Sequence, residues 1–458
     1  MGRGDARQFD YENCLPLRIV VGLYGRVKKE CDMLTLVKLR NAKEEVIAGL
    51  AKKGVDARAT VDEVLALDAR RRELQGESDA QQSQVNQKSR EVGQCMKQGE
   101  RARAEALKAE VATLKEGLKQ RQAEQAEVAA KINELLVQLP NVPHSSVPEG
   151  RTAEDNEVVR SQGAIPELPE GALPHWEIAA RLGIIDFELG VKLTGSGFPV
   201  YRGAGARLER GLINYFIDYN TAAGFEEMMP PIVVNEASAY ATGQLPDKES
   251  QMYVVPLDGF YMIPTAEVPL TNVLRDVILE EDALPVKMTA YTPCFRREAG
   301  SYGKDVRGLN RLHQFDKVEV VCVEHPDRSY ARLDEMVHHV EQLLQNLELP
   351  YRVLHLCGGD MSFTSASTFD LEVFSAAQKR WLEVSSVSNF EDFQSNRLHL
   401  RYRSKEKGIQ LAHTLNGSSL ALPRIVAALL ENNQTPEGVR VPRVLQEWMR
   451  TDFLPWKE

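Results

Sequence analysis

Residues 295–319 read FRREAGSYGKDVRGLNRLHQFDKVE, and this stretch predicts a β-hairpin with a charged, glycine-containing turn. The hairpin would hold a cation, Arg296, and an aromatic ring, Phe315, near the carboxylates of Glu298 and Glu319. Such a spot suits a nucleoside triphosphate beside a zwitterionic amino acid, because fixed opposite charges stabilise both. An ordinary charged hairpin would show the same residues, so the prediction depends on the rest of the chain.

Composition places the chain among ordinary globular proteins. Its 458 residues are 43% hydrophobic and 27% charged, which is enough for two or three domains. The net charge of −10 excludes a bulk positive field for nucleic acid or membranes, although a local basic surface is compatible with it. The six cysteines form no C-x-x-C pair, which predicts free thiols in a reducing cytoplasm and no structural zinc. No apolar run reaches the roughly 18–20 residues that span a bilayer.

Residues 1–32 differ in character from the chain that follows, which begins at Met33 with LTLVKLRNAKEEVIAGLAKKG. We predict that these residues are a disordered or non-native upstream extension. Deleting them is expected to leave thermal unfolding and activity unchanged. A large loss of either in the truncated protein would contradict this prediction.

A long helical hairpin is predicted for residues 61–138, which contain neither proline nor aromatic residues and are rich in helix formers. The glycines within residues 93–103 predict the tip between two antiparallel helices, each about 50 Å long at ~1.5 Å per residue. The second half shows an apolar heptad seam that is interrupted at Arg121 and Gln125. This seam comprises Leu107, Val111, Leu114, Leu118, Val128, Ile132, Leu135 and Leu139.

The distal half of this arm is basic, although the protein as a whole is acidic. Residues 88–121 contain nine lysines and arginines against five acidic residues. This excess predicts a surface that contacts a nucleic-acid phosphate backbone. A coiled coil that serves oligomerisation would explain the periodicity equally well.

The rest of the chain divides into short segments and one large domain. Residues 36–53 predict a single amphipathic helix ending at Gly54, and residues 33–140 would form an N-terminal domain that includes the arm. The proline- and acid-rich residues 141–175 predict a linker. Within residues 176–458, closely spaced β-rich runs with few long crossovers predict a mainly antiparallel sheet flanked by helices. The predicted fold class is α+β.

Two segments of this large domain predict an interface and an amino-acid site. Residues 205–235 combine an apolar helical face with a following strand that Glu226 and two prolines would open, a pattern typical of dimer interfaces or of plain packing. In YMIPTAEVPLTN, residues 261–272, Thr265 and Glu267 would lie on one face at a strand end. A hydroxyl and a carboxylate there suit an ammonium group, and a decorated edge strand is the alternative.

Two further segments predict metal and phosphate contacts. Glu383 and Ser386 lie in a β-rich run and would supply hard oxygen ligands for magnesium, unless this is simply a partly exposed strand. In residues 413–434, a predicted NGSS turn enters an apolar helix that carries Arg424, whose partner would be a phosphate or a buried carboxylate. Pro423 fits the first turn of that helix. The chain contains no G-x-x-x-x-G-K-[ST] phosphate loop.

From Met33 onward the chain resembles the bacterial-type seryl-tRNA synthetase family of class II aminoacyl-tRNA synthetases. Residues 205–235 resemble class II motif 1, residues 295–319 motif 2 and residues 413–424 motif 3. The N-terminal arm is also similar to that of the family. The runs that resemble the serine enzymes in particular are TAE (265–267), HQFDKVE (313–319), SNFEDFQ (388–394) and HTLNGS (413–418).

The resemblance implies a class II antiparallel catalytic sheet of six or seven strands, a homodimer, and a cytoplasmic enzyme that uses ATP with Mg²⁺. The carboxylate of L-serine would attack the α-phosphate of ATP, and the seryl group would then pass to the terminal adenosine of tRNA(Ser), or of tRNA(Sec) as a second acceptor. The arm would contact the long variable region of the tRNA through its shape and backbone. Deleting residues 88–121 should therefore spare adenylate formation and cripple aminoacylation.

The same resemblance implies roles for individual residues. Arg296, Glu298 and Arg424 would be catalytic: Arg296 would bridge the serine carboxylate and the α-phosphate, Glu298 would bind the adenine amino group, and Arg424 the γ-phosphate. The implied serine-binding residues are Thr265, Ala266, Glu267, Arg296, Glu319, Asn416 and Ser418. The implied ATP-binding residues are Arg296, Arg297, Glu298, Phe315, Glu383, Val384, Ser385, Ser386 and Arg424, with Glu383 and Ser386 as the metal ligands. Asp305, Arg307 and Arg311 would contact the acceptor end or pyrophosphate.

A pocket that binds the serine hydroxyl would leave Glu319 and Ser418 unpaired with alanine, and such sites reject the deficient analogue by roughly 10⁴–10⁵. Threonine would be excluded by shape. Two alternatives stay open: a paralogue that charges a carrier protein, which the arm argues against, and an inactive RNA-binding or scaffold protein. A serine-dependent ATP–pyrophosphate exchange assay would separate the inactive protein from an enzyme, and transfer assays would separate the acceptors.

Overall fold

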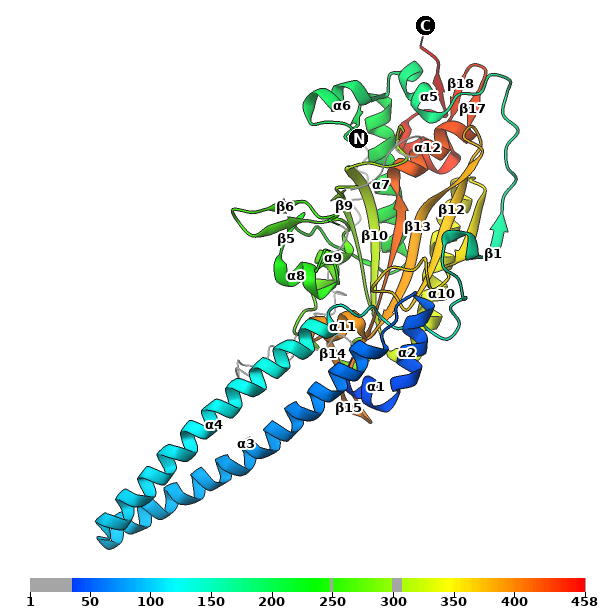
Figure 1. Ribbon diagram of the computed structural model, residues 1–458. Coiled ribbons are helices and arrows are strands. Elements are labelled where there is room, and N and C mark those ends of the chain that lie inside the picture. The colour runs from blue at the N-terminus through cyan, green and yellow to red at the C-terminus, as the bar shows by residue number, and fades with distance from the viewer. Residues whose placement is uncertain (1–34, 248–249, 299–306, 458) are drawn as a thin grey trace, which may run out of the picture.

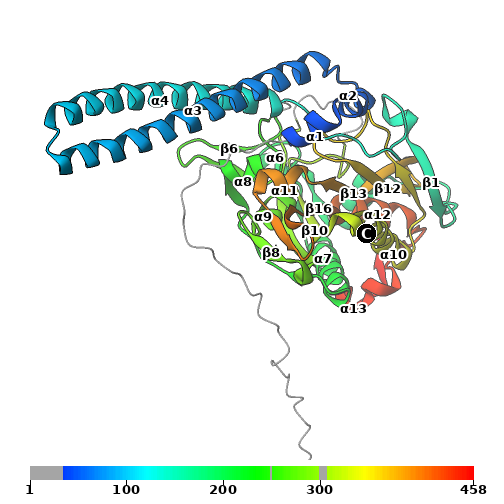
Figure 2. The ribbon, with the colours of Figure 1, turned by 90° about the horizontal axis from the view of Figure 1, so that it is seen from below.

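The computed structural model describes residues 35–247, 250–298 and 307–457, and shows a helical arm projecting from a body built on one large sheet (Figures 1 and 2). The predicted extension, residues 1–32, lies outside the described residues. The predicted α+β class is confirmed. No helix in the described part of the chain is long and apolar enough to cross a membrane.

The first described elements are two short helices, α1 (Leu36–Asn41) and α2 (Lys43–Lys52), so the prediction of one helix over residues 36–53 was wrong. Ala42 leaves the helical conformation, with φ −135° and ψ 37°. Because of this break, the apolar side chains of both helices pack into one cluster at the base of the arm. The second helix ends just before Gly54, whose φ of +77° is the left-handed conformation that glycine tolerates.

The predicted arm is confirmed as two long antiparallel helices, α3 (Arg58–Gln98) and α4 (Arg101–Leu136). They turn at Gly99, which has a φ of +80°. Polar contacts explain the interruption of the heptad seam: Arg121 Nε lies 2.8 Å from Glu77 Oε2, and Gln125 Nε2 donates to Gln75 Oε1 at 2.6 Å. Cross-helix hydrogen bonds therefore replace apolar contacts in this part of the seam.

The body contains an eight-stranded sheet, in which all neighbours are antiparallel except β4 and β9. The number differs from the six or seven strands that the family resemblance implied. The additional edge strand, β1, comes from residues 141–175, the segment predicted as a linker. In spatial order the strands are β1 (Glu157–Gln162), β11 (Tyr351–His355), β12 (Ser367–Ser375), β13 (Arg380–Glu391), β16 (His413–Ala421), β10 (Gln314–Glu324), β9 (Val286–Phe295) and β4 (Glu226–Glu227).

Four helices cover one face of this sheet: α5 (His175–Leu182), α7 (Ala204–Ala222), α10 (Ser329–Asn346) and α12 (Leu422–Asn432). Alternation along β10 separates the two faces, because successive strand side chains point in opposite directions. Val318 and Val320 belong to the apolar cluster beneath these helices, and Val321 and Val323 belong to a different cluster. Glu319 shares the second orientation, which directs it toward the candidate site.

Shorter elements complete the body. Pro230 and Pro231, which were predicted to open a strand, lie instead between β4 and β5. The remaining strands are β2 (Ile185–Asp186), β3 (Val200–Tyr201), β5 (Val233–Asn235), β6 (Val254–Val255), β7 (Phe260–Met262), β8 (Ile278–Glu280), β14 (Arg401–Ser404), β15 (Gly408–Leu411), β17 (Gln434–Thr435), β18 (Gly438–Arg440) and β19 (Phe453–Pro455). The remaining α-helices are α6 (Phe187–Leu193), α8 (Glu236–Ala241), α9 (Glu267–Asn272), α11 (Phe393–Leu398) and α13 (Gln446–Met449).

Candidate active site

A cavity of about 520 Å³ opens on the sheet beside β10, β13 and β16, and most of the predicted site residues line it. These residues come from segments that lie far apart in the sequence, so only the fold brings them together. The predicted residues in its wall are Thr265, Glu267, Arg296, Glu298, Arg311, Phe315, Glu383, Val384, Ser385, Ser386, Asn416, Ser418 and Arg424.

The remaining predicted residues lie elsewhere. Ala266 is fully buried in an apolar cluster, and the exposed Arg297 uses its backbone N–H to bind the carbonyl of Gln251. Glu319 is fully buried and accepts hydrogen bonds from Thr265 and Asn416, which line the cavity. Arg307 lines a neighbouring cavity of about 600 Å³. Asp305 lies outside the described residues.

Arg296 and Glu298 follow the end of β9, which pairs with β10 as the predicted hairpin. Arg296 is fixed at both ends, since its N–H donates to His313 O at 2.9 Å and its Nε to Pro264 O at 3.3 Å. Its guanidinium lies 5.3 Å from the centre of the Phe315 ring, within the range of cation–π attraction. Glu298 has a φ of +48°, an uncommon conformation for a residue with a side chain, and pairs with Arg311 Nε at 2.9 Å.

The side chain of Asn416 links two buried carboxylates, Glu267 in the wall of the cavity and Glu319 outside its lining. The side-chain amide of Asn416 donates to both, at 2.9 Å to Glu267 Oε2 and at 2.8 Å to Glu319 Oε1. Thr265 Oγ1 donates to Glu319 Oε2 at 3.3 Å. The predicted hydroxyl, amide and carboxylates therefore form one connected group, which offers acceptors to a cation or a hydroxyl entering the cavity.

Sequence reasoning missed Lys317, which holds this group together. Its Nζ lies 2.5 Å from Glu319 Oε2 and donates to Thr265 Oγ1 at 2.8 Å. Both charged side chains are buried, so each compensates the desolvation of the other. Alternation along the strand could have identified Lys317, because residues 315, 317 and 319 share one face of β10.

Glu267 has a strongly perturbed pKa. Burial, and after it the charge of nearby Glu319, raise the pKa of Glu267 to about 7, against the lowering effects of Gln394, Lys317 and Arg296. Gln394, at the start of α11, donates to Glu267 Oε1 at 2.6 Å and is a second residue that sequence reasoning missed. A cation bound at this spot would favour the ionised form of Glu267.

Glu383, Ser386 and Asp370 form a cluster of oxygen atoms on the adjacent strands β12 and β13. Asp370 lies opposite Ser386 in the strand register, and its Oδ1 is buried without a hydrogen-bond partner among the described residues. Burial, then the charge of Glu383, raise the pKa of Asp370, and a hydrogen bond from Ser386 opposes them. No group of three or more histidine, cysteine or acidic residues able to hold a metal occurs in the part of the chain that the structure describes.

This chemistry fits Mg²⁺, which binds proteins through one or two carboxylates and takes its other ligands from phosphates and water. Half of the Glu383 side chain is exposed, at 50%, and it lines the cavity together with Ser386. A phosphate-bearing ligand in the cavity could therefore complete the coordination of a cation that these residues would hold only in part.

Arg424 lines the cavity beside Glu383 from the first turn of α12, where Pro423 is tolerated as predicted. Its Nε donates to Asn310 O at 3.1 Å, and one terminal nitrogen donates to Glu383 O at 2.7 Å. These contacts leave the guanidinium partly exposed and fixed in position, which suits the binding of an anion.

Two local predictions around these residues were wrong. Thr265 and Glu267 were predicted at a strand end, but β7 ends at Met262 and Glu267 begins helix α9. Residues 416–419 were predicted as a turn, but they lie in the central strand β16. A Cβ atom at Gly417 would lie 3.2 Å from both methyl groups of Val387, so glycine avoids crowding within the sheet here rather than serving a turn.

Comparison with known proteins identifies the two parts of the chain separately. Residues 33–143 match the seryl-tRNA synthetase N-terminal domain. Residues 255–433 match the tRNA synthetase class II core domain (G, H, P, S and T).

Close relatives and solved structures extend this similarity to most of the chain. The serine–tRNA ligases of Salinibacter ruber and Magnetococcus marinus are 50% and 45% identical, each over 91% of this chain and 98% of the relative. The seryl-tRNA synthetase of Pyrococcus horikoshii, solved with ATP, superposes with a TM-score of 0.87 at 31% identity, covering 93% of this chain and 100% of that one. The cytoplasmic serine–tRNA ligase of Naegleria fowleri, solved with AMP, gives a TM-score of 0.81 at 29% identity, covering 91% and 96%.

These similarities, together with the arm and the polar cavity on the antiparallel sheet, show that the chain belongs to the seryl-tRNA synthetase family of class II aminoacyl-tRNA synthetases.

Proposed function

We propose that this protein attaches L-serine to tRNA(Ser) in two steps, through a seryl-adenylate intermediate. The observation that carries the proposal is the buried group of Glu267, Asn416, Glu319 and Lys317 beside Arg296, because it offers separate partners for the ammonium, hydroxyl and carboxylate of serine. The ammonium group would lie against Glu267 and Thr265. The hydroxyl group would bind Glu319 and Ser418, and Arg296 would receive the carboxylate.

ATP would occupy the outer part of the same cavity. Phe315 would stack on the adenine ring and Glu298 would accept from its amino group, while Arg424 would bind the γ-phosphate. Arg296 would then lie between the serine carboxylate and the α-phosphate, where it neutralises the charge that develops as the carboxylate oxygen attacks phosphorus. The side chains position both reactants and balance charge, so the reaction needs no nucleophile from the protein.

Glu383 and Ser386 would hold Mg²⁺ against the phosphates of ATP, and Asp370 would orient the Ser386 hydroxyl. The ion would supply additional positive charge for the leaving pyrophosphate.

The arm and the body would have separate partners. The helical arm within residues 33–140 would bind tRNA(Ser), and residues 176–458 would form the catalytic domain in a cytoplasmic enzyme. Serylation of tRNA(Sec) stays a prediction of the family resemblance. A homodimer would form beside α7 and β4, where β4 ends the sheet and the following Met229 side chain is 92% exposed. The mass of the protein in solution tests this assembly.

Serine-dependent ATP–pyrophosphate exchange is the direct test of the proposed function. The purified protein should incorporate labelled pyrophosphate into ATP when serine is present, and should not do so with alanine or threonine in its place. Charging of tRNA(Ser) and of a carrier protein then identifies the acceptor. Absence of exchange with serine would overturn the proposal.

The pKa of Glu267 predicts how serine binding depends on pH. An ammonium group pairs with the ionised carboxylate, and a pKa raised to about 7 means that this form is lost as pH falls through neutrality. We expect kcat/KM for serine to fall about tenfold per unit below pH 7, because kcat/KM reports the free enzyme. Exchange measured from pH 6 to 8 at saturating ATP tests this. The Glu267→Gln variant should be less active and lack this pH dependence, and a flat wild-type profile would contradict the assignment.

A further inference from the structure

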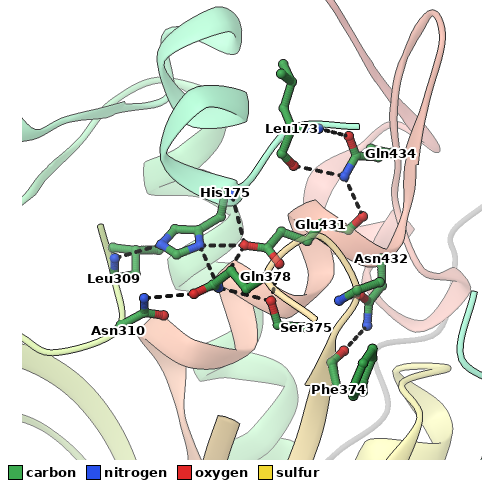
Figure 3. A network of polar contacts seen from close by, with 11 residues as sticks. Leu173, His175, Leu309, Asn310, Phe374, Ser375, Gln378, Glu431, Asn432 and Gln434 are labelled. Carbon is green, nitrogen blue, oxygen red and sulfur yellow. Dashed lines mark hydrogen bonds and ion pairs between the residues drawn. The ribbon is translucent and has the colours of Figure 1, made fainter. Parts of the chain in front are cut away.

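A buried polar network connects helix α5, the segment before β10 and helix α12 (Figure 3). At its centre, the backbone N–H of His175 donates to Glu431 Oε1 at 2.9 Å, and Nδ1 of the same residue lies 2.7 Å from that oxygen. Gln378 Nε2 also donates to Glu431 Oε1, at 2.9 Å, and the Ser375 hydroxyl donates to Oε2. Both His175 and Glu431 are fully buried.

The hydrogen bonds determine the form of the imidazole. The backbone N–H of Leu309 donates to His175 Nε2 at 2.8 Å, so Nε2 must be an acceptor. Nδ1 therefore carries the hydrogen and donates it to Glu431. Burial alone would raise the pKa of Glu431, but hydrogen bonds from His175 and Ser375 lower it below its ordinary value. The pair consists of a carboxylate and a neutral, oriented imidazole.

The first turn of α5 holds the segment from Arg307 to Leu309 by three contacts. The Arg307 guanidinium lies 4.6 Å from the centre of the Trp176 ring. Gly308, with φ +69°, packs so closely that a Cβ atom there would lie 2.2 Å from His175 Nε2. The Leu309 hydrogen bond is the third contact. Packing and hydrogen bonding thus place this backbone against the imidazole ring.

The next residue, Asn310, connects this segment to Arg424 in the cavity. The carbonyl oxygen of Asn310 accepts from Arg424 Nε at 3.1 Å, and the Asn310 amide donates to Gln378 Oε1 at 3.0 Å. Arg424 and Glu431 belong to the same helix, α12. His175 therefore ties the Asn310 carbonyl, which orients the Arg424 side chain, to the helix that carries Arg424.

We propose that His175 is a positioning residue for ATP: its neutral ring fixes Leu309 and Asn310 so that the Arg424 guanidinium is directed at the γ-phosphate. The inference rests on the proposed function. It assigns a role in the reaction to a residue that makes no contact with the cavity and that sequence reasoning did not single out. The predicted effect is specific: loss of the His175 ring should change kcat/KM for ATP but should leave KM for serine unchanged.

Two substitutions of His175 separate the contributions of its two ring nitrogens. In His175→Asn, the amide can still donate to Glu431 but leaves the Leu309 N–H unpaired. In His175→Gln, the longer side chain can place its carbonyl near the position of Nε2 and accept from Leu309, while the donor to Glu431 is lost. The two variants therefore serve as matched controls for each other in a buried site.

The measurement is serine-dependent ATP–pyrophosphate exchange, normalised to active sites by the initial burst of pyrophosphate, with thermal unfolding of each variant recorded in parallel. We expect His175→Asn to lower kcat/KM for ATP by about tenfold to a hundredfold, the effect of one unpaired buried donor. KM for serine should stay within about twofold, and His175→Gln should recover most of the ATP kinetics. A purely structural role would lower the unfolding temperature and the active fraction of both variants and leave their KM for ATP unchanged.

A double-mutant cycle tests the route through Arg424. If His175 acts by orienting this guanidinium, His175→Asn should cost much less in an Arg424→Ala background than in the wild type. Should His175→Asn fail to fold, Gln378→Met cuts the same network at the Asn310 side chain and should show a smaller loss in the same direction.

Three results would overturn the inference. The first is an equal loss of kcat/KM for ATP in the Asn and Gln variants, and the second is a KM for serine that changes together with the KM for ATP. The third is additive losses in the double-mutant cycle with Arg424→Ala. Absence of exchange in the wild-type protein would instead refute the proposed function, so the two failures are distinguishable.

Discussion

Replacing Glu319 with alanine is expected to lower kcat/KM for serine in ATP–pyrophosphate exchange by about 10²–10⁴-fold. Glu319 would bind the serine hydroxyl, and its carboxylate also holds Lys317 and Asn416. Without it, the hydroxyl loses an acceptor and the buried ammonium of Lys317 loses its counterion. Removing one partner of such a buried pair costs far more than the net contribution of the pair.

The effect should be confined to serine. ATP would bind against Phe315, Glu298 and Arg424, none of which contacts Glu319, so KM for ATP should move less than about threefold. Glu280→Ala is the matched control, because the Glu280 side chain is 57% exposed and pairs only at the surface with Arg403. Glu280→Ala should leave kcat/KM for serine and KM for ATP unchanged. Unaltered serine-dependent exchange in Glu319→Ala would remove the pocket assignment.

A second variant separates the loss of function from the loss of stability. Glu319→Ala leaves Lys317 as an uncompensated buried charge, which should destabilise the fold by about 3–5 kcal/mol. Adding Lys317→Met removes that charge and should restore much of the thermal stability. If activity stays low after stability recovers, the lost serine contact is responsible for the kinetic effect.

Local chemistry was visible in the sequence where it depended on residues close together along the chain. The hairpin with Arg296, Glu298 and Phe315 could be predicted because its two strands lie close together along the chain. Lys317 was overlooked although the same alternation places it beside Glu319. Gln394 could not be assigned a role from local pattern, since α11 brings it against Glu267 from 127 residues away.

Errors in secondary structure came from tertiary packing that overrides local preference. Asn-Gly favours tight turns, yet Asn416 and Gly417 lie in a central strand, where a Cβ atom on Gly417 would crowd the methyl groups of Val387. Strand β1 was hidden for a different reason. All six of its residues are exposed, so no apolar alternation marks it within a proline- and acid-rich segment.

Shortening the arm is expected to leave adenylate formation within about twofold of the wild type and to lower kcat/KM for aminoacylation by roughly 10²–10³-fold, because several phosphate contacts would be lost together. The deletion of residues 88–121, suggested by the sequence, needs redesign. It would join Gln87 to Gln122, whereas neighbouring Arg121 pairs with Glu77 on the facing helix, so the two cut ends would not meet. Lys88 faces Glu110, so residues 89–109 can instead be replaced by a short glycine-containing turn.

A charge variant of the full-length arm provides the matched control. Replacing the exposed Arg90, Lys97, Arg101, Arg103 and Lys108 with glutamine keeps the helices, because glutamine is a good helix former, and removes the charge of the distal half. Each lost phosphate contact lowers the dependence of binding on salt concentration, so both variants should show a flatter salt profile for tRNA(Ser) binding. The charge variant should approach the defect of the truncated protein if charge dominates the contact.

The oligomerisation alternative predicts a different pattern. If the coiled coil joined protein copies, the truncated enzyme would dissociate into smaller assemblies in solution, whereas the charge variant would keep the oligomeric state of the wild type. Charging of tRNA would then follow the assembly state. If the arm binds the tRNA backbone, both variants keep the oligomeric state of the wild type and both lose aminoacylation. Full charging of tRNA(Ser) by the truncated enzyme would contradict the proposed role of the arm, because the body alone would then suffice to hold the acceptor.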